Sequence, residues 1–98
     1  MELVNKKNGN ELTVEIIGRL DTTTAPQLEA EMTTQLEGVT ALVLDFAKLE
    51  YISSAGLRVI LATQKTMNKQ GSMKLINVNS DVMEVFEITG FCDILDIE

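Results

Sequence analysis

The chain has 98 residues, of which 45% are hydrophobic, and its formal net charge is −7. This length predicts a single domain over residues 1–98 with enough apolar surface for one packed core. The negative charge argues against nucleic acid or an anionic membrane as a partner, because both are bound through basic patches.

The residues that build several common active sites are missing. The chain has no histidine and a single cysteine, Cys92. A zinc site and a Ser-His-Asp mechanism therefore lack their parts. No G-x-S-x-G turn and no glycine-rich phosphate loop is present, which disfavours a serine hydrolase and a nucleotide site. We expect neither a metal nor another cofactor.

The single cysteine also bears on the compartment. It cannot form an internal disulfide, which fits a reducing cytoplasm. Residues 1–10 lack the apolar core of a signal peptide. No stretch approaches the roughly 18 to 20 apolar residues of a membrane span. We therefore expect a cytoplasmic protein with no membrane partner.

The first elements read as a β-hairpin. Residues 2–7 predict a short strand, and residues 8–10, Asn-Gly-Asn, are a turn signal. Leu12, Val14 and Ile16 then alternate with polar residues, which is typical of a half-buried strand.

Residues 18–24 are expected to form a loop before the first helix. Thr24 followed by Gln27 fits a capping box, and Pro26 suits the first helical turn. Gly38 is a reasonable residue for the helix to end at, because glycine is common just after a helix C-terminus. The inner face of this helix is predicted at a spacing of four residues: Leu28, Met32 and Leu36.

The middle of the chain predicts a central strand and a second helix. The apolar run 41–46 suits a strand that helices cover on at least one face. Residues 47–53 are expected to form a loop, and a helix should follow over residues 55–69 and end at Gly71. Its predicted inner face is Leu57, Ile60, Leu61 and Gln64.

The last third predicts a strand at residues 73–78 and a third helix capped by Asn79 or Ser80 and closed by Gly90. The inner face of that helix should be Val82, Val85 and Phe86. Residues 94–97 suggest a final short strand or edge.

The resulting order, ββαβαβαβ, indicates an α/β fold. We expect a small mixed β-sheet of four to five strands with helices mainly on one side. After the initial hairpin, the strands should pair in parallel through right-handed crossovers.

Two adjacent serines open the second helix. Serine is a favoured N-cap, worth about 1 kcal/mol, but Ser53 or Ser54 alone suffices for that role, so one hydroxyl is spare. Ala55 and Gly56 follow, and glycine is a poor helix former. We interpret Gly56 as letting the backbone of another protein come close. The spare hydroxyl of one of the two serines is then a candidate phospho-acceptor.

Three segments resemble the STAS domain family, the anti-sigma factor antagonists. Residues 51–61, YISSAGLRVIL, look like the family signature. Residues 18–21, GRLD, with the helix from Thr24, look like its second motif, and residues 86–91, FEITGF, like its third. The resemblance covers nearly the whole chain, in order.

This resemblance implies a βα fold without catalytic activity. It places the phosphorylated serine of the family at Ser54. The expected partner is an anti-sigma factor that is also a serine kinase. The unphosphorylated antagonist binds it and frees the sigma factor, the phosphorylated form is released, and a phosphatase resets the cycle.

The resemblance also implies a contact surface made of the loop before the first helix and the start of the second. For Asp21 the alternative is a loop carboxylate that accepts backbone N–H groups, and Thr22 and Thr23 have an alternative as turn residues. Asp45 is expected to be structural. The expected contact residues are Asp21, Thr22, Thr23, Thr24, Ser53, Ser54, Ala55, Gly56 and Arg58.

The chain departs from the family pattern beside the acceptor. The family often has aspartate where this chain has Ser53, and serine or threonine where it has Ala55. Ser53 therefore remains a rival acceptor. The alternative function is a STAS subunit of a larger complex that is never phosphorylated, such as a lipid-transport ATPase or a stress-sensing assembly.

Overall fold

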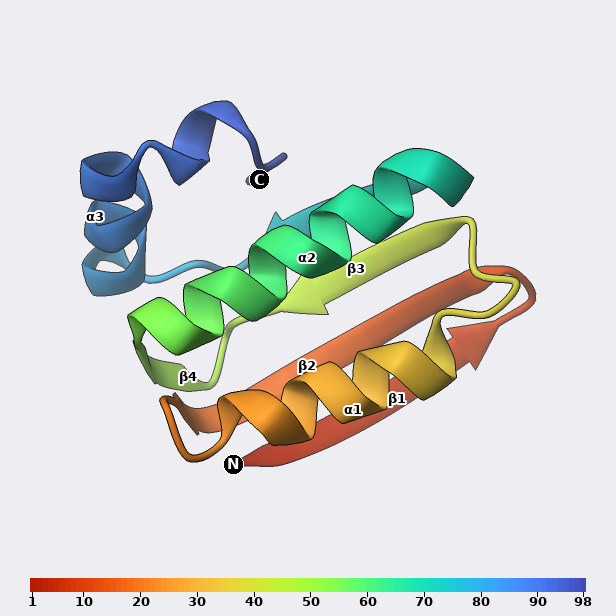
Figure 1. The fold of residues 1–98 in the computed structure, drawn as a ribbon, viewed down its shortest axis with the longest axis horizontal. Helices are drawn as coiled ribbons and strands as arrows, with labels where there is room; N and C mark the ends of the chain where they lie inside the picture. The colour runs from red at the N-terminus through yellow and green to blue at the C-terminus, as the bar shows by residue number, and fades with distance from the viewer.

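Strands and helices alternate along the chain, and the computed structural model describes all of residues 1–98 (Figure 1). Helices α1 and α2 lie side by side across one face of a mixed five-stranded sheet, and α3 lies near β4 (Figure 1). This confirms the predicted fold class. The elements are β1 (Glu2–Asn8), β2 (Glu11–Leu20), α1 (Ala25–Gln35), β3 (Ala41–Asp45), β4 (Leu49–Ile52), α2 (Ser54–Gln70), β5 (Ser72–Ile76), α3 (Ser80–Thr89) and the 3-10 turn η1 (Phe91–Asp93).

The sheet begins with the predicted hairpin. Strands β1 and β2 pair antiparallel from Glu2 opposite Ile17 to Asn8 opposite Glu11. Gly9 takes the turn with a positive φ of 62°, a conformation that glycine adopts without steric cost. Strands β2, β3 and β5 then pair in parallel, so the order is β1-β2-β3-β5.

Strand β2 has two parallel partners in succession. Its first half, residues 11–15, pairs with β3, and residues 18–20 pair with β4 after an irregularity between Gly18 and Arg19. The predicted loops at 18–24 and 47–53 were therefore too long, because residues 18–20 and 49–52 belong to β2 and β4, whereas residues 21–24 do form a loop. Strand β4 has four residues and is buried only at its two ends, Leu49 and Ile52, so it carries no alternation of period two.

The core lies between the sheet and the helices. Leu12, Val14 and Ile16 of β2 are fully buried, as their alternation predicted. The predicted inner face of α1 is also buried: Leu28, Met32 and Leu36. Helix α1 ends a little before Gly38, at Gln35.

Helix α2 confirms most of its predicted inner face and corrects one residue. Leu57, Ile60 and Gln64 are buried, but Leu61 is only half-buried. The core takes Val59 instead, because α1 packs on that side of α2 and both helices line the groove beside Val59.

The C-terminal segment differs from its prediction. Asn79 caps α3 by accepting the N–H of Val82 at 2.8 Å, and Gly90 ends it in the left-handed conformation. Residues 94–97 form no strand. A single parallel bridge joins Ile97 to Leu75, where the tail lies along the edge of β5, so the alternative of an edge describes this segment better than a strand. None of the helices is long and apolar enough to cross a membrane.

Gly56 is required by packing inside the chain. It is buried, and a Cβ built there would lie 2.7 Å from Cγ of Leu20 and 3.0 Å from Cγ1 of Ile52. The interpretation that Gly56 admits the backbone of another protein is therefore wrong. The missing side chain lets the start of α2 approach the ends of β2 and β4.

Ile60→Ala should lower the free energy of unfolding by about 2 to 5 kcal/mol, because it empties a fully buried site. Leu61→Ala, one residue along, should cost clearly less. Urea denaturation of both variants tests the assignment of the inner face. Equal losses would show that the helix is rotated from the orientation described.

Gly56→Ala should destabilise the protein by about 1 to 3 kcal/mol through overpacking, although alanine is the better helix former by about 1 kcal/mol. A loss of stability would therefore show that the steric clash outweighs the higher helix propensity of alanine, and a gain would show the reverse. In a Leu20→Ala background the same substitution should cost less, since the nearest clash is gone. A gain of stability in the wild-type background would contradict the close approach.

Candidate functional site

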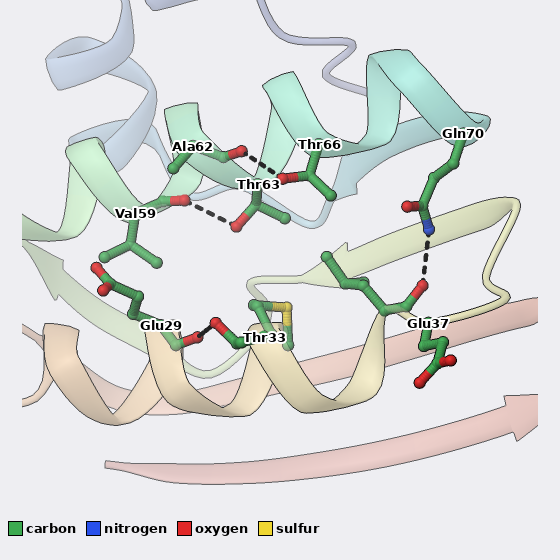
Figure 2. Close-up of a pocket in the computed structure, with 10 residues that line it drawn as sticks. Glu29, Thr33, Glu37, Val59, Ala62, Thr63, Thr66 and Gln70 are labelled. Carbon is green, nitrogen blue, oxygen red and sulfur yellow. Dashed lines mark hydrogen bonds between the residues drawn. The ribbon is translucent and has the colours of Figure 1, made fainter.

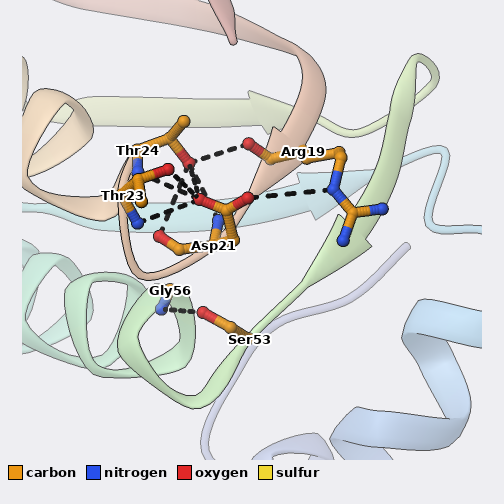
Figure 3. Close-up of polar contacts among 6 residues, drawn as sticks. All are labelled: Arg19, Asp21, Thr23, Thr24, Ser53 and Gly56. Atoms are coloured by element: carbon orange, nitrogen blue, oxygen red, sulfur yellow. Dashed lines mark hydrogen bonds and ion pairs between the residues drawn. The ribbon is translucent and has the colours of Figure 1, made fainter.

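The two serines at the start of α2 have different roles. Ser53 is extended, and its Oγ accepts the backbone N–H of Gly56 at 3.3 Å (Figure 3). Its own N–H donates to the carbonyl of Leu20 at 2.9 Å. Ser54 is the first helical residue, is exposed, and makes no side-chain hydrogen bond within the chain. One hydroxyl caps the helix and the other is free, as predicted.

Asp21 organises the loop between β2 and α1. Its Oδ1 accepts the hydroxyl of Thr23 at 2.7 Å, the N–H of Thr23 at 3.0 Å and the N–H of Thr24 at 3.1 Å (Figure 3). The hydrogen bond from the Thr23 hydroxyl is the largest cause that lowers the pKa of Asp21, with the two N–H groups adding to it against some desolvation. The carboxylate thus has the structural role that was its alternative.

Thr24 does not form the predicted capping box. Its hydroxyl donates to the carbonyl of Arg19 at 2.8 Å and accepts the N–H of Asp21 at 2.8 Å, so it makes no cap bond to α1. Gln27 reaches the carbonyl of Met1 instead. The box fails because the N–H groups before α1 are already bound by Asp21.

The exposed end of the β2–β4 pair carries two further residues that sequence reasoning did not assign to the site. Arg19 lies opposite Tyr51, and its guanidinium carbon is 4.4 Å from the centre of the tyrosine ring. Such a cation–π contact orients both side chains. Arg19 also forms an ion pair with Asp21, with 3.7 Å between its Nε and the Oδ2 of the carboxylate. Tyr51 belongs to the signature segment, but the pairing could not be seen without β4.

A groove runs between α1 and α2. Its first part, about 330 Å³, is lined by Thr22, Ala55 and Arg58 among others. It continues into a second part of about 370 Å³ that shares Glu29 and Val59 with the first (Figure 2).

The hydroxyls along this groove are used by the helices themselves. Those of Thr33 and Thr63 donate to the carbonyls of Glu29 and Val59, four residues before each (Figure 2). Gln70 closes the far end by donating to the carbonyls of Leu36 and Val39. The polar lining therefore serves helix and loop geometry.

The predicted contact residues thus fall into connected groups. Ser54, Ala55 and Arg58 lie on the first turns of α2, and Thr22 faces them across the groove from the preceding loop. The N–H of Ser53 donates to the carbonyl of Leu20, which joins the start of α2 to the end of β2. The loop that contains Asp21, Thr23 and Thr24 begins directly after Leu20.

Asp45 lies apart from these groups, and its surroundings are those of a structural residue. Its carboxylate accepts the N–H of Ala47 at 2.9 Å and the side-chain amide of Asn77 at 3.0 Å. This is the structural role expected for it.

Solved structures share this fold. SpoIIAA of Bacillus, an anti-sigma factor antagonist, matches in its unphosphorylated form with a TM-score of 0.85 at 20% identity, over 99% of this chain and 88% of that one. The phosphorylated form of SpoIIAA matches with a TM-score of 0.77 at 19% identity, over 99% and 91%.

Relatives by sequence are closer. BtrV of Bordetella bronchiseptica, named as an anti-sigma factor antagonist, is 40% identical over 99% of this chain and 85% of its own length. The anti-sigma-B factor antagonist of Bacillus subtilis is 37% identical over 94% and 85%. The profile of the STAS domain matches residues 2–98. The chain therefore belongs to the STAS domain family.

Proposed function

We propose that this protein is a bacterial, cytoplasmic anti-sigma factor antagonist. Unphosphorylated, it binds and sequesters an anti-sigma factor that has serine kinase activity. Phosphorylation of Ser54 by that partner ends the binding, and a phosphatase restores the free hydroxyl. Relatives that are named as antagonists, at 40% and 37% identity over nearly the whole chain, support the first part.

The free hydroxyl of Ser54 is the observation that carries the switch. A kinase needs a hydroxyl that is exposed and unbound, and Ser54 meets both conditions. Ser53 does not, because its oxygen holds the N–H of Gly56. Phosphorylation of Ser53 would also disturb the cap. That SpoIIAA, which shares the fold, was solved in both phosphorylation states supports a switch of this kind.

The switch acts at the contact surface and leaves the fold unchanged. A phosphate adds about −1.5 to −2 charges at pH 7. At the N-terminus of α2 it meets unbound N–H groups and the positive end of the helix dipole, a gain of about 0.3 to 1 kcal/mol. The domain has no reason to rearrange.

The phosphate that the helix terminus accommodates is unfavourable for the surface of the partner. That surface packs against a neutral hydroxyl and would have to desolvate a dianion. A charge left buried and poorly paired costs several kcal/mol, and about 1.4 kcal/mol is tenfold in affinity. The surface that loses contact comprises the loop 21–24, Ser53, Ser54, Ala55 and Arg58.

Incubation with ATP and an anti-sigma factor kinase from the same bacterium should place phosphate on Ser54. Ser54→Ala should abolish labelling. Ser53→Ala should lose about 1 kcal/mol of stability with its cap but still be labelled, and phosphosite mapping by mass spectrometry checks this. A phosphate on Ser53 would identify the rival acceptor. Binding without any phosphorylation would favour the unphosphorylated STAS subunit of a larger complex.

A cost of several kcal/mol corresponds to a loss of affinity of about a hundredfold or more for a true phosphate. Ser54→Asp should weaken binding to that partner by less than this, since it adds less charge on a shorter side chain. Ser54→Ala should stay fully competent. Ser80→Asp is the matched control, because Ser80 is the exposed first residue of α3, directly after its cap. Isothermal titration calorimetry measures all three, and equal affinities for Ser54→Asp and wild type would refute the switch.

A further inference from the structure

The charges of the three helices are sharply segregated. Helix α1 carries Glu29 and Glu31 and no base, and α3 carries three acids and no base. Helix α2 has 17 residues without a single acid, and its bases are Arg58, Lys65 and Lys69. In a chain with a net charge of −7, α2 is thus the one helix with a positive surface.

These bases form a stripe together with Ser54. At about 3.6 residues per turn, the four positions fall within roughly 60° of one another around the helix. That arc is opposite the buried face of Ile60 and Met67. The stripe is roughly 22 Å long at about 1.5 Å per residue, and Ser54 stands at its N-terminal end. All four side chains are exposed.

The stripe is not neutralised within the molecule. The three ion pairs of the structure involve Arg19, Lys48 and Lys74, so no base of the stripe has an acidic partner. Lys65 and Lys69 are moreover four residues apart, a spacing at which like charges repel on a helix surface. A glutamate at residue 65 would favour the helix, because it would stand four residues before Lys69. The sequence of α2 therefore keeps a base at residue 65 that the stability of the helix does not call for, whereas Lys69 in the last turn suits the helix dipole.

We propose that this stripe, Ser54, Arg58, Lys65 and Lys69, docks against an acidic surface of the anti-sigma factor, an inference that rests on the function proposed above. Charge complementarity fits a protein patch better than a polyanion, because the acidic α1 lies beside α2 and would repel an extended phosphate backbone or membrane. The stripe is also continuous with the switch residue.

Phosphorylation then has a second, longer-range effect. The stripe carries three positive charges, and a phosphate on Ser54 adds about −1.5 to −2 at pH 7. Its net charge falls to about +1 to +1.5, and the phosphate places negative charge at the end of the stripe where Ser54 stands. The attraction that speeds association is thereby lost along with the contact itself.

Lys65→Glu tests the stripe away from the switch, with the same anti-sigma factor as probe. The affinity should fall by about tenfold at low salt, mainly through slower association, and the difference should shrink as salt screens the charges. The melting temperature should not fall, because the substitution places a carboxylate four residues before Lys69, the favourable order on a helix. Weaker binding at unchanged or higher stability cannot come from misfolding.

Lys6→Glu is the matched control. It makes the same change of charge at an exposed residue of β1 that forms no ion pair. Strand β1 lies at the opposite edge of the sheet from β5, the strand that α2 contacts. Its affinity should equal that of wild type. An equal loss in both variants would show a net-charge effect and overturn the stripe.

The remaining outcomes separate this inference from the function on which it rests. If wild type does not bind the anti-sigma factor, both fall. If wild type binds, and Ser54→Asp weakens binding while Lys65→Glu does not, the stripe alone falls. The last measurement is the binding of wild type and Lys65→Glu to vesicles of phosphatidylglycerol and phosphatidylcholine. Binding of wild type that Lys65→Glu abolishes would assign the stripe to a membrane surface and overturn the proposal.

Discussion

The site depends on one constraint, the way the end of β2 is held against the start of α2. Strand β2 leaves β3 after residue 15 and pairs with β4 at residues 18–20. This places the carbonyl of Leu20 on the N–H of Ser53 and its side chain in the space left open by Gly56. The loop of Asp21 and the helix of Ser54, far apart in sequence, therefore start from the same point. A change at this junction would alter both halves of the surface together.

The division of labour between the two serines follows from that junction. A helix start needs a side-chain acceptor for its unbound N–H groups, and Ser53 supplies it while its backbone is fixed to Leu20. Ser54 is left with no structural duty, so its hydroxyl can change chemically at little cost to the fold. Under the proposed function, the helix cap and the phosphorylated hydroxyl thus belong to adjacent residues instead of competing for one.

Much of the fold could be predicted from the sequence, because long elements leave periodic signals. The alternation at Leu12, Val14 and Ile16 and the spacing of Leu28, Met32 and Leu36 marked buried faces correctly. The four residues of β4 are too few to show a period, and their pairing with β2 is a long-range contact. Missing β4 hid the Arg19–Tyr51 pair and gave Gly56 the wrong explanation. The sequence was sufficient to predict that one serine caps α2 and the other keeps a free hydroxyl, because a cap is a local feature; the structure assigns the cap to Ser53.

The two edges of the sheet are protected by different means. Strand β1 is an open edge that carries the exposed lysines Lys6 and Lys7, which discourage pairing with another chain. Strand β5 has no such charge pair, and its Leu75 is covered instead by the tail through the bridge to Ile97. Loss of the last few residues would therefore open a strand edge to aggregation while leaving the surface around Ser54 in place. The tail therefore protects the edge of β5 in the way that the exposed lysines protect the edge of β1.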